Sequence, residues 1–417
     1  MNLADMLCYA DIQQLSSIAD TYGCDCNGHS KNELIQSILS KVNRRDVFEQ
    51  QLTKLSLEDI RFLNSIAFDT RDLFSLEELI ARARLSNFTS VSPYGAAAGL
   101  TPAPAPASAT AVTVPVPAKR SNGKKAKAAP PPPEPWNPRE MITKFKRSGW
   151  LFNGYSQQTR YLFQFPSDMK RRFTETMAKQ FRSELTYEDE PAVYRDEQGL
   201  FVDDIYHFLH HIYHNEVPLT ADGSIYKRPL QQILDRLSVP EEPPKAVWRF
   251  GYGRRFKDLP NRFSLLYDYC YYQGLIEEQE TALVLTDRGK LSVLEGRREE
   301  LTQAYRFWFK LYKNPIPNLQ SIVYWVEQLA RDWIRADSLS KVLCPLIRPF
   351  YYDTSEAIFQ ERILPMMMHL GLLRIGQDEQ AGAVVRMTKL GSGVVTGTYV
   401  PDEDKIALPI DNPPFPC

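Results

Sequence analysis

The stretch Gly274-Leu275-Ile276, followed by Thr286-Asp287-Arg288-Gly289, is matched later in the chain by Gly371-Leu372-Leu373 and Thr388-Lys389-Leu390-Gly391. Each copy follows an amphipathic stretch and leads into a short helical run. The copies differ mainly in the number of residues between the Gly and Thr motifs. Two unrelated stretches rarely acquire the same punctuation by chance, so the match indicates an internal repeat of one supersecondary unit. The unit reads as helix, strand, hairpin, strand and helix cap.

This pattern fits a winged helix. A glycine allows the chain to leave the recognition helix, and a two-stranded wing of variable length follows, because insertions in a surface loop cost little. Ahead of the first copy, the turn Leu219–Gly223 and the helical start at Tyr226 suit the helix-turn-helix half of the same unit. We therefore expect a mostly α-helical chain with small β-hairpin wings, an α+β fold with tandem winged-helix domains. Winged helices most often contact nucleic acid.

Composition is compatible with several folded domains. The chain has 417 residues, of which 43% are hydrophobic and 12% aromatic, enough to bury substantial cores. Its six cysteines are few and scattered, which favours reduced thiols over a disulfide framework. No apolar run approaches the roughly 20 residues that a membrane span needs, and Met1–Asp5 has no basic signal-like start. We expect a cytoplasmic, nucleoid-associated protein without a membrane partner.

The net charge of −1 hides strong local asymmetry. Residues 119–182 hold fifteen Lys and Arg against four acids, whereas residues 184–204 hold eight acids against Arg195. A chain with almost no total charge can therefore still present a face that attracts phosphate.

Changes in composition divide the chain. Two short helices and two further helical runs form an all-helical module at the N-terminus, and a stretch rich in Ala, Pro and Ser with a basic cluster reads as a disordered linker. The expected segments are a helical module (1–90), the linker (91–137), an α/β connecting segment (138–198), a first winged-helix domain (199–298), a second winged-helix domain (299–400) and a tail (401–417).

Several stretches resemble a known family. The run from Leu219 to Arg228, the run Phe359–Pro365, the motif His369–Leu373 and the motif Met387–Gly391 are similar to bacterial helicase-associated proteins that carry the N-terminal region of XPB-type helicases. The first 85 residues, with Lys31–Ile35, look like the N-terminus of that family, whose helical pair is of the SAP type. The resemblance implies stacked winged-helix units in a DNA-associated protein. We expect its partners to be DNA, bound without sequence preference or according to its structure, and a helicase or another protein.

The sequence gives no positive sign of catalysis. A helicase motor needs a Gly-rich phosphate loop ending in Gly-Lys-Ser/Thr, and none is present. The run Gly251-Tyr252-Gly253 lacks the third glycine and the strand-to-helix context of a dinucleotide site. A Gly-x-Ser-x-Gly elbow is also missing. We expect a protein that is not an enzyme and that has no cofactor.

Two groups of residues could hold a metal by their types. His207, His210, His211 and His214 include pairs at i,i+4 spacing, but the apolar stripe Ile205-Phe208-Leu209-Ile212 predicts that they face solvent on the opposite side of a helix. Cys24, Cys26 and His29 lack both the usual spacing and a fourth ligand. We favour a solvated helix face and a turn with incidental thiols, with metal binding as the alternative.

The residues most suited to nucleic acid lie before the first copy of the repeat. From Trp248 to Phe263, Arg and Lys alternate with aromatic residues, which supplies phosphate charge together with stacking faces. The alternative is a connector whose aromatic side chains enter the core while its arginines stay solvated. Two more cations open the helix after the turn, and linker lysines could bind the phosphate backbone. The candidate DNA-binding residues are Lys227, Arg228, Arg249, Arg254, Arg255, Lys257, Arg262, Lys124, Lys125 and Lys127.

A second function class is a protein-interaction scaffold. Winged helices also pair with proteins, and aromatic residues of the C-terminal half would suit a partner surface as well as a core. These residues are Tyr351, Tyr352, Trp325, Trp333, Phe307, Trp308 and Phe309.

Overall fold

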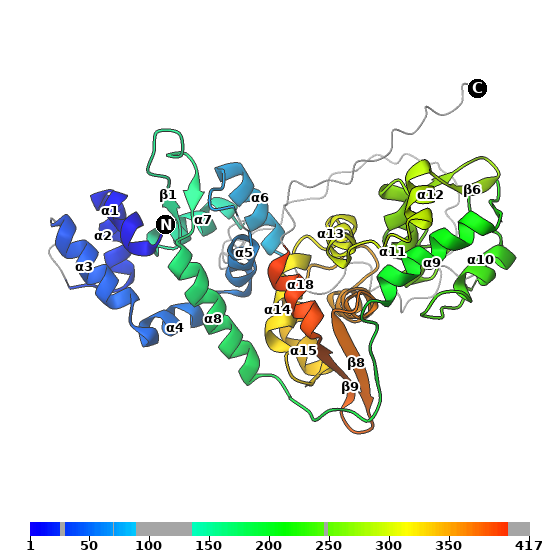
Figure 1. The fold of residues 1–417 in the computed structure, drawn as a ribbon. Helices are drawn as coiled ribbons and strands as arrows, with labels where there is room; N and C mark the ends of the chain where they lie inside the picture. The colour runs from blue at the N-terminus through cyan, green and yellow to red at the C-terminus, as the bar shows by residue number, and fades with distance from the viewer. Residues whose placement is uncertain (26–29, 70, 89–135, 246–248, 399–417) are drawn as a thin grey trace, which may run out of the picture.

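The computed structural model describes residues 1–25, 30–69, 71–88, 136–245 and 249–398. These residues form a mostly helical fold with small antiparallel sheets, which confirms the expected α+β class (Figure 1). Four helices come first and pack around Leu7, Leu15 and Ile38. They are α1 (Leu3–Tyr9), α2 (Ile12–Thr21), α3 (Lys31–Val42) and α4 (Arg45–Thr53).

The repeat read from the sequence corresponds to a repeated order of elements. We number the units by their order in the chain, and the earlier copy of the repeat is the second unit. It consists of a helix, a short strand, two more helices, a two-stranded hairpin and a closing helix. Its sheet has the order β4-β6-β5, so the first strand pairs with the last. Its elements are α9 (Leu200–His214), β4 (Val217–Pro218), α10 (Lys227–Leu234), α11 (Asn261–Tyr272), β5 (Ile276–Glu278), β6 (Ala282–Leu285) and α12 (Asp287–Leu294).

The third unit has the same order of helices and strands, and its first strand again pairs with its last (β7-β9-β8). Its third helix is continuous but changes pitch, with a π-helical middle. The elements are α14 (Leu319–Leu329), β7 (Ile334–Arg335), α15 (Ala336–Leu343), the third helix formed by α16 (Ser355–Ala357), η3 (Ile358–Ile363) and α17 (Leu364–His369), the strands β8 (Leu373–Asp378) and β9 (Gly382–Met387), and α18 (Lys389–Gly397). A short 3₁₀ turn, η2 (Cys344–Leu346), follows α15.

A further copy, the first unit, was not expected from the sequence. Phe74 pairs with Phe163, and Phe163 lies in a strand that pairs with the strand before it. This gives the same strand order as in the other two units, first beside last. Residues 89–135 separate its second and third helices. Its elements are α5 (Leu57–Ala67), the bridge at Phe74, α6 (Leu76–Ser86), α7 (Pro138–Arg147), β1 (Phe152–Asn153), β2 (Phe163–Gln164) and α8 (Ser167–Ser183).

The glycine after the third helix has a positive φ in all three units. The φ is 71° at Gly149, 65° at Gly274 and 71° at Gly371. Only glycine adopts this conformation at little cost, so it lets the chain turn from the helix into the hairpin. The expected connecting segment (138–198) therefore contains the third helix and hairpin of the first unit, and α7 packs against α2 and α6.

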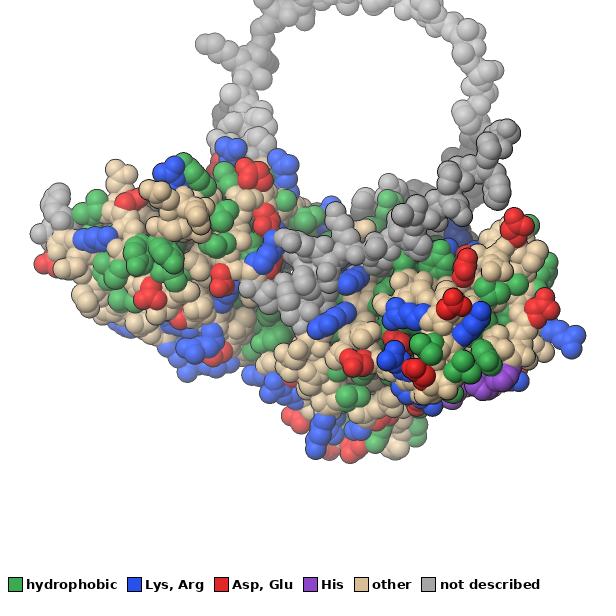
Figure 2. Space-filling view, turned by 45° about the horizontal axis from the view of Figure 1, so that its top comes forward, with side chains coloured by type: hydrophobic (Ala, Val, Ile, Leu, Met, Phe, Trp, Pro, Cys, Tyr) green, Lys and Arg blue, Asp and Glu red, His purple; other side chains and the backbone are tan. Residues whose placement is uncertain are grey.

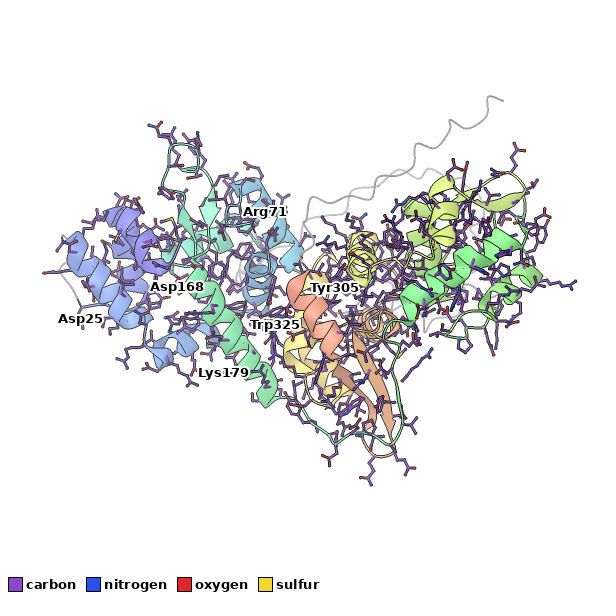
Figure 3. All side chains as sticks on the ribbon, viewed as in Figure 1. Asp25, Arg71, Asp168, Lys179, Tyr305 and Trp325 are labelled. Atoms are coloured by element: carbon purple, nitrogen blue, oxygen red, sulfur yellow. The ribbon has the colours of Figure 1, made fainter. Side chains whose placement is uncertain are left out.

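The spatial order of the units differs from their order in the chain. In Figure 1 the third unit lies between the first unit and the second unit. Trp325 of α14, labelled in Figure 3, donates from its indole nitrogen to Asn64 Oδ1 of α5 at 2.9 Å, and its ring contacts Phe181 of α8. On the other side, α13 (Leu301–Tyr312) packs against both α11 and α14. Figure 3 also labels Asp168, which accepts a hydrogen bond from the amide of Leu3 at 2.8 Å.

The acidic segment 184–199 runs along the third unit from one sheet edge to the other, and we call it the strap. Tyr187 bridges to Ile334 in β7, whereas β3 (Tyr194–Arg195) pairs with β8. The amide of Glu188 donates to the Trp333 carbonyl at 2.9 Å between these two pairings. Both edges of this sheet are therefore occupied by the strap.

Candidate nucleic-acid interface

The arginines between residues 249 and 262 are engaged within the protein. Arg249 donates to the Leu259 carbonyl at 3.0 Å and to Asn261 Oδ1 at 2.6 Å. The ring of Phe250 contacts Phe350 and Tyr352. This run therefore links the second and third units. Its aromatic side chains pack inward, as in the alternative interpretation of the alternating pattern, but its arginines bind other groups of the protein and are not simply solvated.

Arg254 and Arg255 share one carboxylate. Their guanidinium groups lie 3.2 and 2.9 Å from Glu278 Oε2, and Arg255 also donates to the Asp222 carbonyl at 3.0 Å. Burial favours the neutral form of Glu278, but its hydrogen bonds to Arg255 and Tyr267, together with the charges of Arg254 and Arg255, outweigh burial and hold its pKa below the ordinary value. The carboxylate already compensates part of the positive charge that either arginine could offer to a phosphate.

Arg262 has to be removed from the candidate residues, because its side chain is fully buried. It lies 2.7 Å from Asp204 Oδ2 and 3.3 Å from Glu197 Oε2. Glu197 in turn contacts His369 Nδ1 of the third unit at 2.9 Å. This role could not be predicted from the sequence, because Glu197 of the strap and Asp204 of α9 are distant from Arg262 in the chain.

Three further candidates remain at the surface. Lys257 is exposed, with its Nζ 5.9 Å from the ring centre of Phe256. Lys227 and Arg228 are exposed at the start of α10, and neither has an ion pair among the described residues. They open the second helix of their unit, however, and not the third. Lys124, Lys125 and Lys127 lie outside the described residues.

The third helix, which would enter a DNA groove in a helix-turn-helix arrangement, is accessible to different extents in the three units. In α11, every residue from Arg262 to Cys270 is buried. The third helix of the third unit is also mostly buried, including Ile358, Phe359 and Met367. In α7, by contrast, Met141, Ile142 and Phe145 face the core while Arg139, Thr143 and Arg147 are exposed. The first unit therefore presents the most accessible third helix.

The balance of charged residues also distinguishes α7 from the third helices of the other two units. Residues 138–147 hold four basic residues and one acid, whereas residues 261–272 hold one of each and residues 355–369 hold one Arg and two acids. Lys144 is paired with Asp59 of α5. Arg139, Lys146 and Arg147 have no ion pair with any described residue. Three cations of α7 are therefore available for an anionic partner.

The hairpin of the first unit adjoins this helix and has compatible charge. Lys146 Nζ lies 5.5 Å from the ring centre of Phe163 in β2. Residues 148–166 contain Arg160 and no acid, whereas residues 274–286 contain three acids and no base. Residues 371–388 contain two bases and two acids, and the acidic strap pairs with both edges of that sheet. The helix α7 and the hairpin β1–β2 together form the candidate interface.

The histidines divide between surface and core. His210 and His214 lie at the surface with ring centres 4.4 Å apart, and histidine side chains form a visible group in Figure 2. His211, which we expected to face solvent, is 3% exposed, and burial lowers its pKa. His207 Nδ1 lies 3.4 Å from Asp204 Oδ1.

Within the described residues no group of three or more His, Cys, Asp or Glu side chains is arranged to hold a metal. Cys26 and His29 lie outside the described residues, so the Cys24-Cys26-His29 prediction stays open. Among the helices that the structure describes, none is both long and apolar enough to cross a membrane.

Most aromatic residues proposed for a protein partner are core residues. Trp325, Trp333, Phe307, Trp308 and Phe309 are all buried. Tyr351 and Tyr352, in contrast, are 60% and 58% exposed.

No protein-family model, curated protein or solved structure matches the chain. The resemblance to helicase-associated proteins therefore stays a prediction from the sequence.

Proposed function

We propose that the chain is a non-catalytic DNA-binding protein built from three winged-helix units, and that the first unit makes the principal contact. The observation that carries the proposal is the exposed side of α7, where Arg139, Lys146 and Arg147 have no ion pair with the described residues. In a helix-turn-helix arrangement the third helix meets the DNA, and exposed arginines and lysines bind its phosphates.

The geometry of the unit supports the same proposal. The cations of α7 and Arg160 of the hairpin belong to adjacent elements of one unit, joined through the contact of Lys146 with Phe163. The hairpin of the second unit carries three acids and no base, and that of the third unit carries two of each, which gives a weaker attraction for phosphate. A helicase-associated, repair or transcription setting fits this proposal, with the resemblance to helicase-associated proteins as its only support.

A direct test measures binding of a fluorescent duplex at low salt. Reversing charge at Arg139 and Arg147 should weaken binding by roughly tenfold or more, because two phosphates would meet repulsion where each now meets a cation. The matched control is the same reversal at Lys227 and Arg228, which are equally exposed but lie on a second helix. If the wild-type chain binds neither this duplex nor a DNA with a single-stranded segment at low salt, the proposed function is wrong. If only the control variant loses affinity, the placement on α7 is wrong.

The scaffold alternative has one specific observation in its favour. Tyr351 and Tyr352 form the tip of a tight turn, closed by two hydrogen bonds between the backbones of Phe350 and Asp353. Tyr351 has a φ of 49°, which is strained for a residue with a side chain. Asp353 is held by Arg362 and by the hydroxyl of Tyr252. Binding of a protein partner here should resist high salt, unlike binding of DNA. Replacement of both residues, Tyr351→Ala with Tyr352→Ala, should abolish binding of that partner.

A further inference from the structure

The hairpin of the first unit carries exposed aromatic side chains that its counterparts lack. Tyr155 is 62% exposed and Tyr161 is 69% exposed, one near each end of the loop between β1 and β2. The corresponding turns of the other units read Gln279-Glu280-Thr281 and Glu379-Gln380-Ala381, without an aromatic residue. Because the other two hairpins fold without such rings, the fold itself does not require tyrosines at these positions.

The two rings are oriented by their surroundings. Tyr155 stacks on Tyr9 of α1, with ring centres 5.1 Å apart and an angle of 28° between the planes. The guanidinium carbon of Arg160 lies 4.6 Å from the ring centre of Tyr161. Tyr161 is therefore presented beside a cation and Tyr155 beside a second ring, and the loop that carries both contains no acid.

The loop that carries the rings is internally braced. The hydroxyl groups of Ser156 and Thr159 lie 2.8 Å apart, and the amide of Arg160 donates to the Ser156 carbonyl at 2.9 Å. Asn153 donates from its side chain to the Arg160 carbonyl at 2.9 Å. A Cβ at Gly154 would overlap Thr159, so the loop also depends on a close backbone approach at this glycine. A braced loop loses little conformational entropy when a ligand stacks on it.

We infer that this hairpin binds unpaired bases next to a duplex, so that the preferred ligand is DNA at a junction between double-stranded and single-stranded segments. The inference rests on the proposed DNA-binding function. Exposed rings, one of them beside an arginine, suit the flat face of a nucleobase, and a base exposes that face only where it is unstacked from its neighbours. The cations of α7 supply phosphate contacts for the adjoining duplex, and Lys146 places them next to the hairpin.

The experiment compares three probes in the same anisotropy titration: a blunt duplex, the same duplex with an oligothymidine overhang, and the oligothymidine strand alone. The wild-type chain should bind the overhang probe more tightly than either other probe. Replacing Tyr155 and Tyr161 by alanine should remove this preference, a loss of roughly fivefold to a hundredfold for each ring on which a base stacks. Affinity for the blunt duplex should stay unchanged.

Two controls make the result specific. Tyr213 and Tyr226 of the second unit are 42% and 50% exposed, and their double alanine variant should keep the preference for the overhang. Phenylalanine at 155 and 161 should also keep it, because the ring face remains. The inference is overturned if the wild-type chain binds blunt and overhang probes equally, or if the alanine variant retains the preference. A chain that binds the blunt duplex without any preference would sink only this inference, whereas failure to bind any probe would overturn the proposed function.

Discussion

The hydroxyl of Thr388 donates a hydrogen bond of 2.8 Å to the carbonyl of Gly371. The hydroxyl oxygen of Thr388 also accepts a hydrogen bond of 2.8 Å from the amide of Gly391, and this bond caps α18. The second unit repeats the arrangement, because Thr286 donates to Gly274 at 2.6 Å and accepts from Gly289 at 3.1 Å. The Gly-to-Thr-to-Gly motif is therefore a joint that fixes the helix after the hairpin to the chain segment before it.

The joint predicts a large effect of Gly391→Ala on stability. A Cβ at Gly391 would overlap the backbone of Leu372, so the variant should lose roughly 1–3 kcal/mol of unfolding free energy, as in other overpacked sites. Gly393 lies in the same helix with nothing near its missing Cβ, and Gly393→Ala should be neutral or stabilise by up to about 1 kcal/mol. Urea denaturation of both variants checks the pair, and equal effects would contradict the joint.

The repeat could be predicted from the sequence because its requirements are local. A helix that ends in a tight turn needs glycine at Gly274 and Gly371, and the cap needs Thr with Gly three positions later. The first unit could not be predicted from the same motif for two reasons. Pro166 stands where the other units have the capping threonine, and residues 89–135 interrupt the turn between its second and third helices. Of the Gly-to-Thr-to-Gly motif, the first unit keeps only the first glycine, Gly149.

The candidate site was harder to predict, because pairing of charges depends on contacts between distant segments. Arg254 and Arg262 look alike in the sequence, yet the first is held by Glu278 of a hairpin and the second is buried against Asp204 of another helix. Arg139 and Arg147 look like ordinary surface charge until α7 is recognised as a third helix. The sequence shows which residues are cations, but not which carboxylates pair with them in the fold.

Arg262 predicts a large cost for removal of a buried charge. Arg262→Met would leave Asp204 and Glu197 without their shared cation, and breaking one side of a buried ion pair typically costs about 3–5 kcal/mol. The control is Arg298→Met, since Arg298 and Asp203 form a half-exposed pair at 3.5 Å, which should contribute less than about 1 kcal/mol. Thermal and urea unfolding measure both. A small effect at Arg262 would show that the carboxylates are relieved by other groups.

Asp268 predicts a pH dependence of stability. The pKa of its carboxyl is raised from 3.8 to about 7, mainly by burial and to a smaller extent by the nearby charge of Glu278. The hydrogen bond of 2.9 Å from the amide of Arg254 and the charges of Arg254 and Arg255 lower the pKa, but they do not cancel the effect of burial. Below its unfolded pKa the group is protonated in both states. As the pH rises toward about 7, the unfolded chain releases the proton first, so folding loses about 1.4 kcal/mol for each unit of pKa difference.

Asp268→Asn removes this titration and keeps an acceptor for the amide of Arg254. The variant should therefore gain stability relative to the wild-type chain as the pH rises from about 4 to about 7, with a constant difference above that range. Urea denaturation of both proteins at several pH values measures the difference directly. A difference that does not change with pH would contradict the raised pKa.

The linker lysines predict a change in salt dependence. Lys124, Lys125 and Lys127 precede Pro138, the first residue of α7, by 11 to 14 residues in the chain, and we expect them to add phosphate contacts to DNA bound at α7. Replacing all three by glutamine should lower the slope of log affinity against log salt by up to about 0.9 for each phosphate of duplex DNA that is no longer neutralised. Unfolding free energy should stay unchanged, and arginine at the three positions should keep the slope. An unchanged slope in the glutamine variant would restrict the phosphate contacts to the folded units, because every neutralised phosphate releases counterions whether the cation lies in a helix or in a linker.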